Sequence, residues 1–304
     1  MSIRRLLPIA VMAVGIVLQG RIVRAQTVMV DCPGDRLQAA VDAARPGVTI
    51  LVRGVCAENV VIPDEAARIT LDGQGSATIR GPNPAAATIQ VFGRGITIRG
   101  FTITGGSAGV LLFRGGTAII DRNTIQNTNS YGIAVAQHSY AVIIGNTIQS
   151  NPVGIVVQEG SSARIGVQNP DDRTPRGNVI RNNGVDGGVR INQNSSARLA
   201  MNIISDNAGP GVSVLGASFA VVSSNRIDGN AGDGVTVTQN SAVQLGGDLG
   251  VLGPPNETNV LNRGLGISCS LNSSASGRMG TLYGAKGSLD FNSSCAYALE
   301  RHQR

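Results

Sequence analysis

The chain has 304 residues, of which 42% are hydrophobic and 14% are charged, and it contains four cysteines, two histidines and no tryptophan. Its formal net charge is +6, but its arginines are scattered and Lys286 is its single lysine. This distribution offers no basic stripe that could neutralise a row of phosphates, so nucleic acid is excluded as a partner. The sequence also lacks the histidine pairs and close cysteine pairs of a zinc site, so no metal ligands are assigned from these residues.

The first 25 residues have the pattern of a secretory signal peptide. Arg4 and Arg5 precede an apolar run from Leu6 to Leu18, and the segment ends at Ala25. The run is shorter than the roughly 20 residues that span a bilayer as a helix. We expect cleavage after Ala25, a secreted or periplasmic protein and no membrane span in the mature chain; an uncleaved anchor is the alternative. Loss of the four arginines in this segment would lower the net charge to +2.

The mature chain, residues 26–304, is expected to form a single domain. Residues 35–47 predict a short amphipathic helix that ends at Pro46-Gly47. Leu37, Val41 and Ala44 fall on one face, which suits a helix that caps the open end of a stack of strands. Residues 26–75 are therefore interpreted as the N-terminal cap and first rungs. Strand-like pieces follow at 48–52, 59–62, 69–71, 77–79, 87–91 and 96–103.

A repeat dominates residues 76–275. Seven times a glycine is followed by an apolar, variable, apolar triplet, with steps of 23, 22, 34, 23, 23 and 32 residues. The glycines are Gly109, Gly132, Gly154, Gly188, Gly211, Gly234 and Gly266. Each unit carries three short segments with apolar residues at period two, too short for helices. A period in the twenties predicts an all-β solenoid, a parallel β-helix, with 276–304 as its C-terminal cap.

Columns of one residue type mark the turns of this repeat. Asparagine tolerates left-handed backbone, and stacked amides can hydrogen-bond from rung to rung. One predicted column contains Asn123, Asn146, Asn178, Asn202, Asn225 and Asn259. A second, five residues further on, contains Thr128, Asn151, Asn183, Asn207 and Asn230, and a serine column contains Ser139, Ser161, Ser195, Ser218, Ser241 and Ser273. All three columns are interpreted as structural.

The cysteines lie about one repeat apart in pairs. Cys32 and Cys56 are separated by 24 residues, and Cys269 and Cys295 by 26. Residues one rung apart in a stack are about 4.8 Å from each other, within the reach of a disulfide. In an oxidising compartment this spacing predicts two disulfides, one near each end. Two pairs of buried thiols are the alternative.

Four N-terminal segments, together with the rungs that follow them, are similar to those of a known family. The segments are Leu37-Gln-Ala-Ala-Val, Pro46-Gly47, Gly54-Val-Cys-Ala-Glu-Asn-Val-Val-Ile and Ile69-Thr-Leu-Asp-Gly. They resemble the right-handed β-helix proteins of the pectate lyase-like superfamily. The resemblance covers roughly residues 30 to 275. It implies a right-handed parallel β-helix and, since many such proteins bind, cleave or epimerise polysaccharides, a polysaccharide or glycan partner. Fold likeness specifies activity only weakly.

Two rungs are long because each has about ten extra residues at the same corner. The first insert contains Asp171, Asp172, Arg173 and Arg176, and the second contains Asp248, Glu257 and Arg263. Loops on a rigid scaffold often carry binding residues, so these inserts are expected to frame a shallow groove. The acidic pair could hold Ca²⁺ through oxygens, or arginines could position a uronate carboxylate. A solvated turn with scattered charges is the alternative.

Arg190 is the one charge among the outward positions of the glycine-headed strands, in the rung of the first insert. It is therefore a candidate ligand-facing cation. The stacked aspartates of a lyase Ca²⁺ site, the paired aspartates of pectin esterases and an Asp-Pro-His-Asp motif are all missing. His138 aligns with the turn residues Asn194, Asn240 and Asn272, which makes a triad with Ser139 a poor fit.

Three functional hypotheses remain. The first is an exported, monomeric protein that binds polysaccharide or cell-surface glycan through Asp171, Asp172, Arg173, Arg176 and Arg190. The second is a polysaccharide lyase acting on uronate polymers, which needs a base and a charge-stabilising cation at one carbon. The third is a structural or adhesion surface protein without catalytic activity. The sequence leaves open whether the protein is an enzyme.

Overall fold

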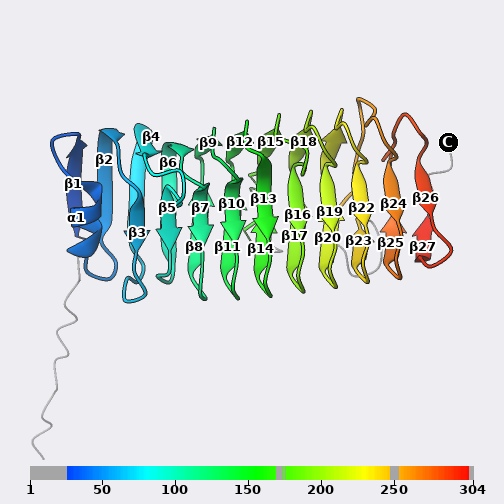
Figure 1. Ribbon diagram of the computed structural model, residues 1–304, viewed down its shortest axis with the longest axis horizontal. Coiled ribbons are helices and arrows are strands. Elements are labelled where there is room, and N and C mark those ends of the chain that lie inside the picture. The colour runs from blue at the N-terminus through cyan, green and yellow to red at the C-terminus, as the bar shows by residue number, and fades with distance from the viewer. Residues whose placement is uncertain (1–25, 169–173, 175, 247–252, 301–304) are drawn as a thin grey trace, which may run out of the picture.

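The computed structural model describes residues 26–168, 174, 176–246 and 253–300 as a long stack of short strands (Figure 1). The predicted signal peptide lies outside the described residues, and so do Asp171, Asp172, Arg173 and Asp248. The named strands pair in parallel, each with the strands one rung before and after it. The parallel β-solenoid predicted from the repeat is therefore confirmed.

One side of the stack is a 10-stranded sheet that contains the glycine-headed strands. Its strands are β3 (Val60–Ile62), β5 (Ile89–Val91), β7 (Ala108–Leu112), β10 (Tyr131–Val135), β13 (Val153–Val157), β16 (Val189–Ile191), β19 (Val212–Val214), β22 (Val235–Val237), β24 (Ile267–Cys269) and β26 (Leu289–Phe291).

The remaining strands form a 17-stranded sheet with two columns, which are joined because the long strand β6 pairs with both β8 and β9. The first column is β1 (Thr27–Cys32), β2 (Thr49–Cys56), β4 (Thr70–Gly81), β6 (Ile96–Gly105), β8 (Thr117–Asp121), β11 (Tyr140–Ile144), β14 (Ser162–Ile165), β17 (Ser196–Ala200), β20 (Phe219–Ser223), β23 (Ala242–Leu245), β25 (Ser274–Arg278) and β27 (Ala296–Glu300). The second is β9 (Thr124–Gln126), β12 (Thr147–Gln149), β15 (Val179–Arg181), β18 (Ile203–Ser205) and β21 (Arg226–Asp228).

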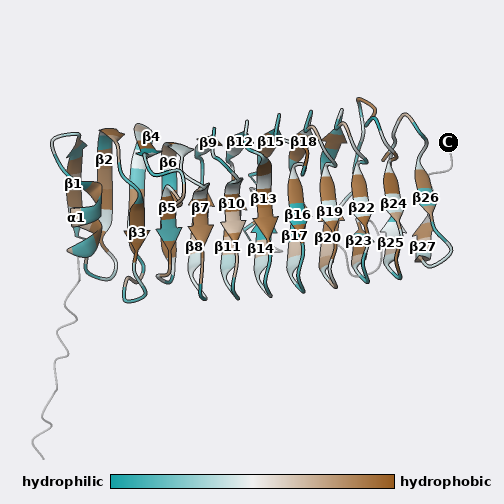
Figure 2. Ribbon diagram, in the orientation of Figure 1, coloured by the Kyte–Doolittle hydropathy of each residue, from teal (hydrophilic) through white to brown (hydrophobic). Residues whose placement is uncertain are grey.

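The core is a set of apolar columns inside the stack. Alternate residues of each strand point inward, so that Ile120, Ile143, Ile165 and Leu199 lie one above another with no exposed surface. Burying one such side chain stabilises the fold by about 1.5–3 kcal/mol. In Figure 2 hydrophobic colour alternates with pale and hydrophilic colour along the strands. Each rung is too thin to bury its apolar face alone, so stability depends on stacking.

Asparagine side chains join the rungs at two corners. The Nδ2 of Asn202 donates to the carbonyl of Ile165 at 2.9 Å and to the Oδ1 of Asn225 at 2.9 Å, while its own Oδ1 accepts from the backbone N–H of Asn178 at 3.0 Å. The same pattern repeats along both predicted columns, and these asparagines are buried. The structural role of the columns is confirmed.

The last member of the first column differs from the prediction. Asn225 donates to Asn256, not to Asn259, and Asn256 completes the column by donating to the carbonyl of Val222. Asn259 is exposed, and its N–H donates to Asp228. The prediction for Asn259 was wrong because the pattern Asn259-Val-Leu resembles the start of a strand. In the structure, Val260 and Leu261 are exposed.

The serine column stabilises the corner between the two sheets. The backbone N–H of Ser139 donates to the Oγ of Ser161, and Ser161, Ser195, Ser218 and Ser241 continue the chain of bonds to Ser273, each at 3.1 Å. Burial of these serines leaves their backbone groups without water, so the hydroxyl supplies the required partner.

Both predicted disulfides are present, Cys32–Cys56 and Cys269–Cys295. The helix α1 (Leu37–Asp42) lies within the range predicted for a helix and packs against β1, β2 and β3 with Leu37 and Val41 buried. The carboxylate of Glu58 accepts from the N–H groups of Leu37 and Gln38 at 2.8 and 3.3 Å, which satisfies the free donors at the start of this helix.

We expect Asn202→Ala to lower the free energy of unfolding by at least about 3 kcal/mol, because a buried N–H and two buried carbonyls lose their partner at about 1–3 kcal/mol each. Urea unfolding measures this change. Asn129→Ala, at an exposed asparagine with one hydrogen bond of 3.3 Å, is the control and should cost less than about 1 kcal/mol. Equal losses in the two variants would contradict a special role for the column.

We expect Gly211→Ala to destabilise the stack by about 1–3 kcal/mol through overpacking. A Cβ at Gly211 would lie 2.7 Å from Cγ2 of Ile227 and 2.8 Å from the carbonyl oxygen of Gly234, so rung spacing itself requires glycine here. Gly34→Ala, where the nearest atom would lie 3.4 Å away, should change stability by less than about 0.5 kcal/mol. Thermal and urea unfolding of both variants would test this, and an unaffected Gly211→Ala protein would refute it.

Candidate functional site

The two inserts lie at the same corner of the solenoid. The first leaves the stack after β14 and returns at Asn178, and the second leaves after β23 and returns at Asn256. Both returns are members of the first asparagine column, so the prediction of a common corner is confirmed. Two regular rungs, containing Asn202 and Asn225, separate the inserts.

Both arginines of the predicted site that the structure describes, Arg176 and Arg190, form ion pairs. Arg176 lies 3.5 Å from the buried carboxylate of Asp121, which also pairs with Arg122 at 3.1 Å. Arg190 lies on β16, where its guanidinium is 3.5 Å from Asp186 and its side chain is 32% exposed. Arg176 therefore lies in the first insert and Arg190 in the 10-stranded sheet, each beside its own carboxylate.

A hollow of about 280 Å³ lies between the inserts, against the second one. Its ionisable side chains are Arg226, which is 2.8 Å from Asp228, and Glu257. The full lining is Met201, Asn202, Ile203, Ser224, Asn225, Arg226, Pro254, Pro255 and Glu257. Because the two asparagines are committed to the ladder and the prolines offer no N–H donor, this hollow presents few groups that could recognise a ligand.

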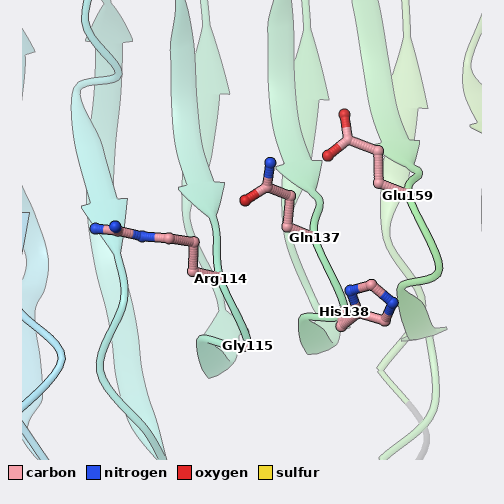
Figure 3. Close-up of a pocket in the computed structure, with 5 residues that line it drawn as sticks. All are labelled: Arg114, Gly115, Gln137, His138 and Glu159. Atoms are coloured by element: carbon pink, nitrogen blue, oxygen red, sulfur yellow. The ribbon is translucent and has the colours of Figure 1, made fainter.

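A larger hollow, of about 530 Å³, lies on the turns that follow β7, β10 and β13 (Figure 3). It is lined by Arg114, Gly115, Gln137, His138 and Glu159. These residues belong to three successive rungs, and the side chains of Arg114, Gln137 and Glu159 emerge from corresponding positions of neighbouring turns in Figure 3. The hollow therefore presents a polar side chain from each of three rungs, with His138 as a second one on the middle rung.

The backbone of these turns explains the row. Each turn places two consecutive residues in the left-handed region, for example Gln137 at φ 53° and His138 at φ 59°. The N–H of the second residue donates to the carbonyl of the first residue of the next turn, as from His138 to Glu159 at 3.0 Å. Neighbouring strands are about 4.8 Å apart, so the first-position side chains stand in a row at that spacing on a rigid backbone.

Aromatic side chains extend the row at its N-terminal end. Phe92 and Phe113 follow β5 and β7, and their rings make an edge contact with centroids 6.2 Å apart. The guanidinium of Arg114 lies over the ring of Phe92 at 4.4 Å. This cation–π contact holds Arg114 beside a partly exposed aromatic surface.

His138 occupies the turn position that the sequence predicted, in the column of Asn194, Asn240 and Asn272. Its exposed imidazole lies over Gly160, the corresponding residue of the next turn. This hollow was not predicted from the sequence, because the turn columns were interpreted as purely structural. The signal was the polar residue before each turn position, Gln137 and Glu159, which follows the same 22-residue step as the glycines.

Metal and membrane sites receive no support from the described part of the chain. No three Asp, Glu, His or Cys side chains gather there in a group that could hold a metal ion. No helix among the same residues is long and apolar enough to cross a bilayer.

The parallel rungs with laddered corners define the protein as a β-solenoid with polar side chains on its turns. The right-handed β-helix region, as a family, matches residues 87–169 and 162–249, more than half of the chain. The chain therefore belongs to the right-handed β-helix family, as the resemblance implied. No curated protein sequence matches the chain significantly.

Solved structures with the same fold include enzymes that act on polysaccharides. The periplasmic alginate epimerase AlgG aligns over 90% of this chain and 84% of its own with a TM-score of 0.55 and 15% identity. The pectate lyase Pel9A aligns over 89% and 78% with a TM-score of 0.57 and 14% identity. The enzymatically active domain of tailspike protein 2 from bacteriophage CBA120 aligns over 90% and 47% with a TM-score of 0.63 and 13% identity. At these low sequence identities, the structural similarity establishes a shared fold and nothing more.

We expect Gly160→Ala to displace the imidazole of His138, because the new Cβ would lie 3.0 Å from Nε2 and 3.1 Å from Cδ2. The exposed ring can swing away, so the protein should fold with a cost of about 1–2 kcal/mol from the left-handed backbone. Gly115→Ala, at the same turn position with no atom within 4 Å of its Cβ, carries the same backbone cost and is the control. NMR signals of His138 should shift in the first variant only; equal shifts in both would contradict the contact.

Proposed function

We propose that the protein binds a polysaccharide or cell-surface glycan along the row of turn side chains Arg114, Gln137, His138 and Glu159. The observation that carries the proposal is this row itself: polar, planar side chains from successive rungs beside two aromatic rings in a hollow of about 530 Å³. We place the binding site at this row and not at the inserts, because Arg176 and Arg190 form ion pairs with Asp121 and Asp186.

The chemistry of the row suits sugar hydroxyls. A hydroxyl both donates and accepts, and the row offers both functions, because Arg114 donates, Glu159 accepts and Gln137 does either. Aromatic rings such as Phe92 and Phe113 provide flat apolar surface for the C–H faces of a sugar ring. The spacing of about 4.8 Å per rung repeats these groups along the stack, as a polymer with a repeating unit requires.

Rigidity supports affinity at this surface. The turn backbones are hydrogen-bonded from rung to rung, at 2.9 Å from Gly115 to Gln137 and 3.0 Å from Gly160 to Gln193. A ligand would therefore order side chains but not the backbone, which limits the entropy lost on binding. The similar structures of an alginate epimerase, a pectate lyase and a tailspike domain support a glycan as the ligand by analogy of fold.

A uronate lyase acting in the same hollow is the second candidate. One specific observation favours it: the hollow holds an imidazole, a carboxylate and a guanidinium on adjacent rungs, the groups that proton abstraction and charge stabilisation need. Incubation with pectate and alginate, with and without Ca²⁺, followed by absorbance of the unsaturated product, tests it. Absence of that product with His138 intact rejects the lyase and leaves the binding proposal standing.

We further propose that residues 1–25 direct export and that the mature chain is a secreted or periplasmic monomer in which α1 caps the first rung. The two disulfides support an oxidising compartment. Burial of Leu37 and Val41 against the first strands supports the role of α1.

We expect Gln137→Ala combined with Glu159→Ala to weaken glycan binding at least tenfold, or about 1.4 kcal/mol. A glycan array identifies the ligand and calorimetric titration measures the dissociation constant. Gln239→Ala is the matched control, because Gln239 occupies the same left-handed turn position three rungs beyond Glu159 and is exposed. Equal weakening by the control, or no binding of any glycan by the unaltered protein, would overturn the proposal.

A further inference from the structure

The two ends of the solenoid differ (Figure 1). At the N-terminal end, α1 packs against β1, β2 and β3 with Leu37 and Val41 buried, and the exposed residues of this helix are Ala39 and Asp42. At the C-terminal end, β26 and β27 are the last strands, and no helix covers them among the described residues. Within the described chain, the core is therefore capped by a helix at one end only.

Four side chains of the inward columns form the C-terminal end face. Leu289 follows the buried Ile267 in its column, and Tyr297 follows the buried Ala275. Tyr297 is nevertheless 62% exposed, because no described residue stacks on it from beyond. The end face consists of Leu289, Phe291, Tyr297 and Leu299.

The two aromatic residues join the sheets across the end of the core. Phe291 on β26 and Tyr297 on β27 have ring centroids 4.8 Å apart, with the ring planes tilted by 40°. Since β26 and β27 belong to different sheets, this contact makes the end face one continuous apolar surface. Contiguous exposed apolar side chains mark an interaction surface.

The backbone of the end face also has a free side. Among the described strands, β26 pairs with β24 and β27 pairs with β25, so each has a neighbour on one side only. The free sides present rows of N–H and C=O groups, with which a further strand can pair. A matching partner for this face therefore offers strand edges together with an apolar surface.

We propose that the C-terminal end face binds the same face of a second copy of this chain, forming a two-fold symmetric dimer. A two-fold axis perpendicular to the solenoid sets β26 against its copy and β27 against its copy as antiparallel pairs, so each edge gains a strand of its own length. The apolar residues of the two faces then cover one another and are removed from water. Because both copies use the same surface, the assembly closes at two.

Other parts of this chain match the end face less well. A head-to-tail contact would place Phe291 and Tyr297 against Ala39 and Asp42 of α1, which are small or charged. The sequence after β27, Arg-His-Gln-Arg, is polar and charged. The end face is also distant from the turn hollow, since β26 lies five strands beyond β13 in the 10-stranded sheet, about 24 Å. The dimer is therefore independent of the proposed glycan binding.

The size of the end face sets the expected strength of the dimer. A rung of about 23 residues at about 3.3 Å each has a perimeter of about 75 Å and encloses at most about 450 Å². Two such faces cover at most about 900 Å² of flat area, at the low end for a specific contact. We therefore expect a dissociation constant on the order of 10 to 100 μM, with the monomer as the dilute form.

Sedimentation of the full chain over a concentration series from about 1 to about 500 μM tests the proposal. Tyr297→Asp should raise the dissociation constant at least tenfold, because it places an unpaired charge in the apolar contact. Phe219→Asp, at an aromatic residue that is 42% exposed in the middle of the 17-stranded sheet, is the matched control and should change it less than twofold. Asp290→Asn should lower the dissociation constant, since centred pairing of β26 sets two Asp290 carboxylates opposite each other. Thermal unfolding of the dilute variants checks that they fold.

Cross-linking identifies the end that forms the contact. Ala298 is the middle residue of β27, so its two copies lie beside the axis in a centred pair. Ala298→Cys chains should cross-link to one another with a short bis-maleimide, whereas Thr27→Cys chains, altered on β1 at the other end, should not. The four native cysteines are in disulfides and do not react. The proposal is overturned if the protein stays monomeric over the whole series, if Tyr297→Asp and Phe219→Asp act alike, or if cross-links form only between Ala298→Cys and Thr27→Cys chains.

Discussion

Asparagine side chains at two corners of the solenoid hydrogen-bond each rung to the next and, in the same step, satisfy backbone groups that burial has removed from water. Asn202 shows the arrangement: its amide bonds Asn225 on one side and accepts from Asn178 on the other, while reaching the carbonyl of Ile165. Corners in a stacked coil have no sheet ladder of their own. Without these amides, the rungs from Asn123 to Asn256 would carry unpaired buried polar groups at two of their corners.

The ladders also determine where variation can occur. Because the chain must return to an asparagine at Asn178 and Asn256, residues can be inserted before that point without disturbing the next strand. The turns between the two sheets are constrained differently, since their backbones hydrogen-bond one another directly from rung to rung. The side chains of Arg114, Gln137 and Glu159 therefore line the hollow without taking part in a rung-to-rung ladder.

Most of the fold could be predicted from the sequence, but less of the site could. Columns such as Ser139 to Ser273 were predictable because each member repeats at the rung spacing and has one structural task. The misassignment of Asn259 shows the limit of that method: within an insert, the spacing is lost and only the hydrogen bond from Asn225 identifies Asn256. Arg190 was a reasonable candidate by position, yet its pairing with Asp186 depends on the path of a turn that sequence alone does not specify.

The rung length, the inward columns, the laddered corners and the disulfide pairs can be predicted from the repeat, because in a solenoid one repeat of sequence is one turn of structure. Which outward side chains meet depends instead on how the rungs stack. Arg164 and Arg198 are 34 residues apart across an insert, and their opposition follows from the register of β14 on β17. The hollow at Gln137, His138 and Glu159 likewise requires three rungs to be stacked, since no single rung contains more than part of it.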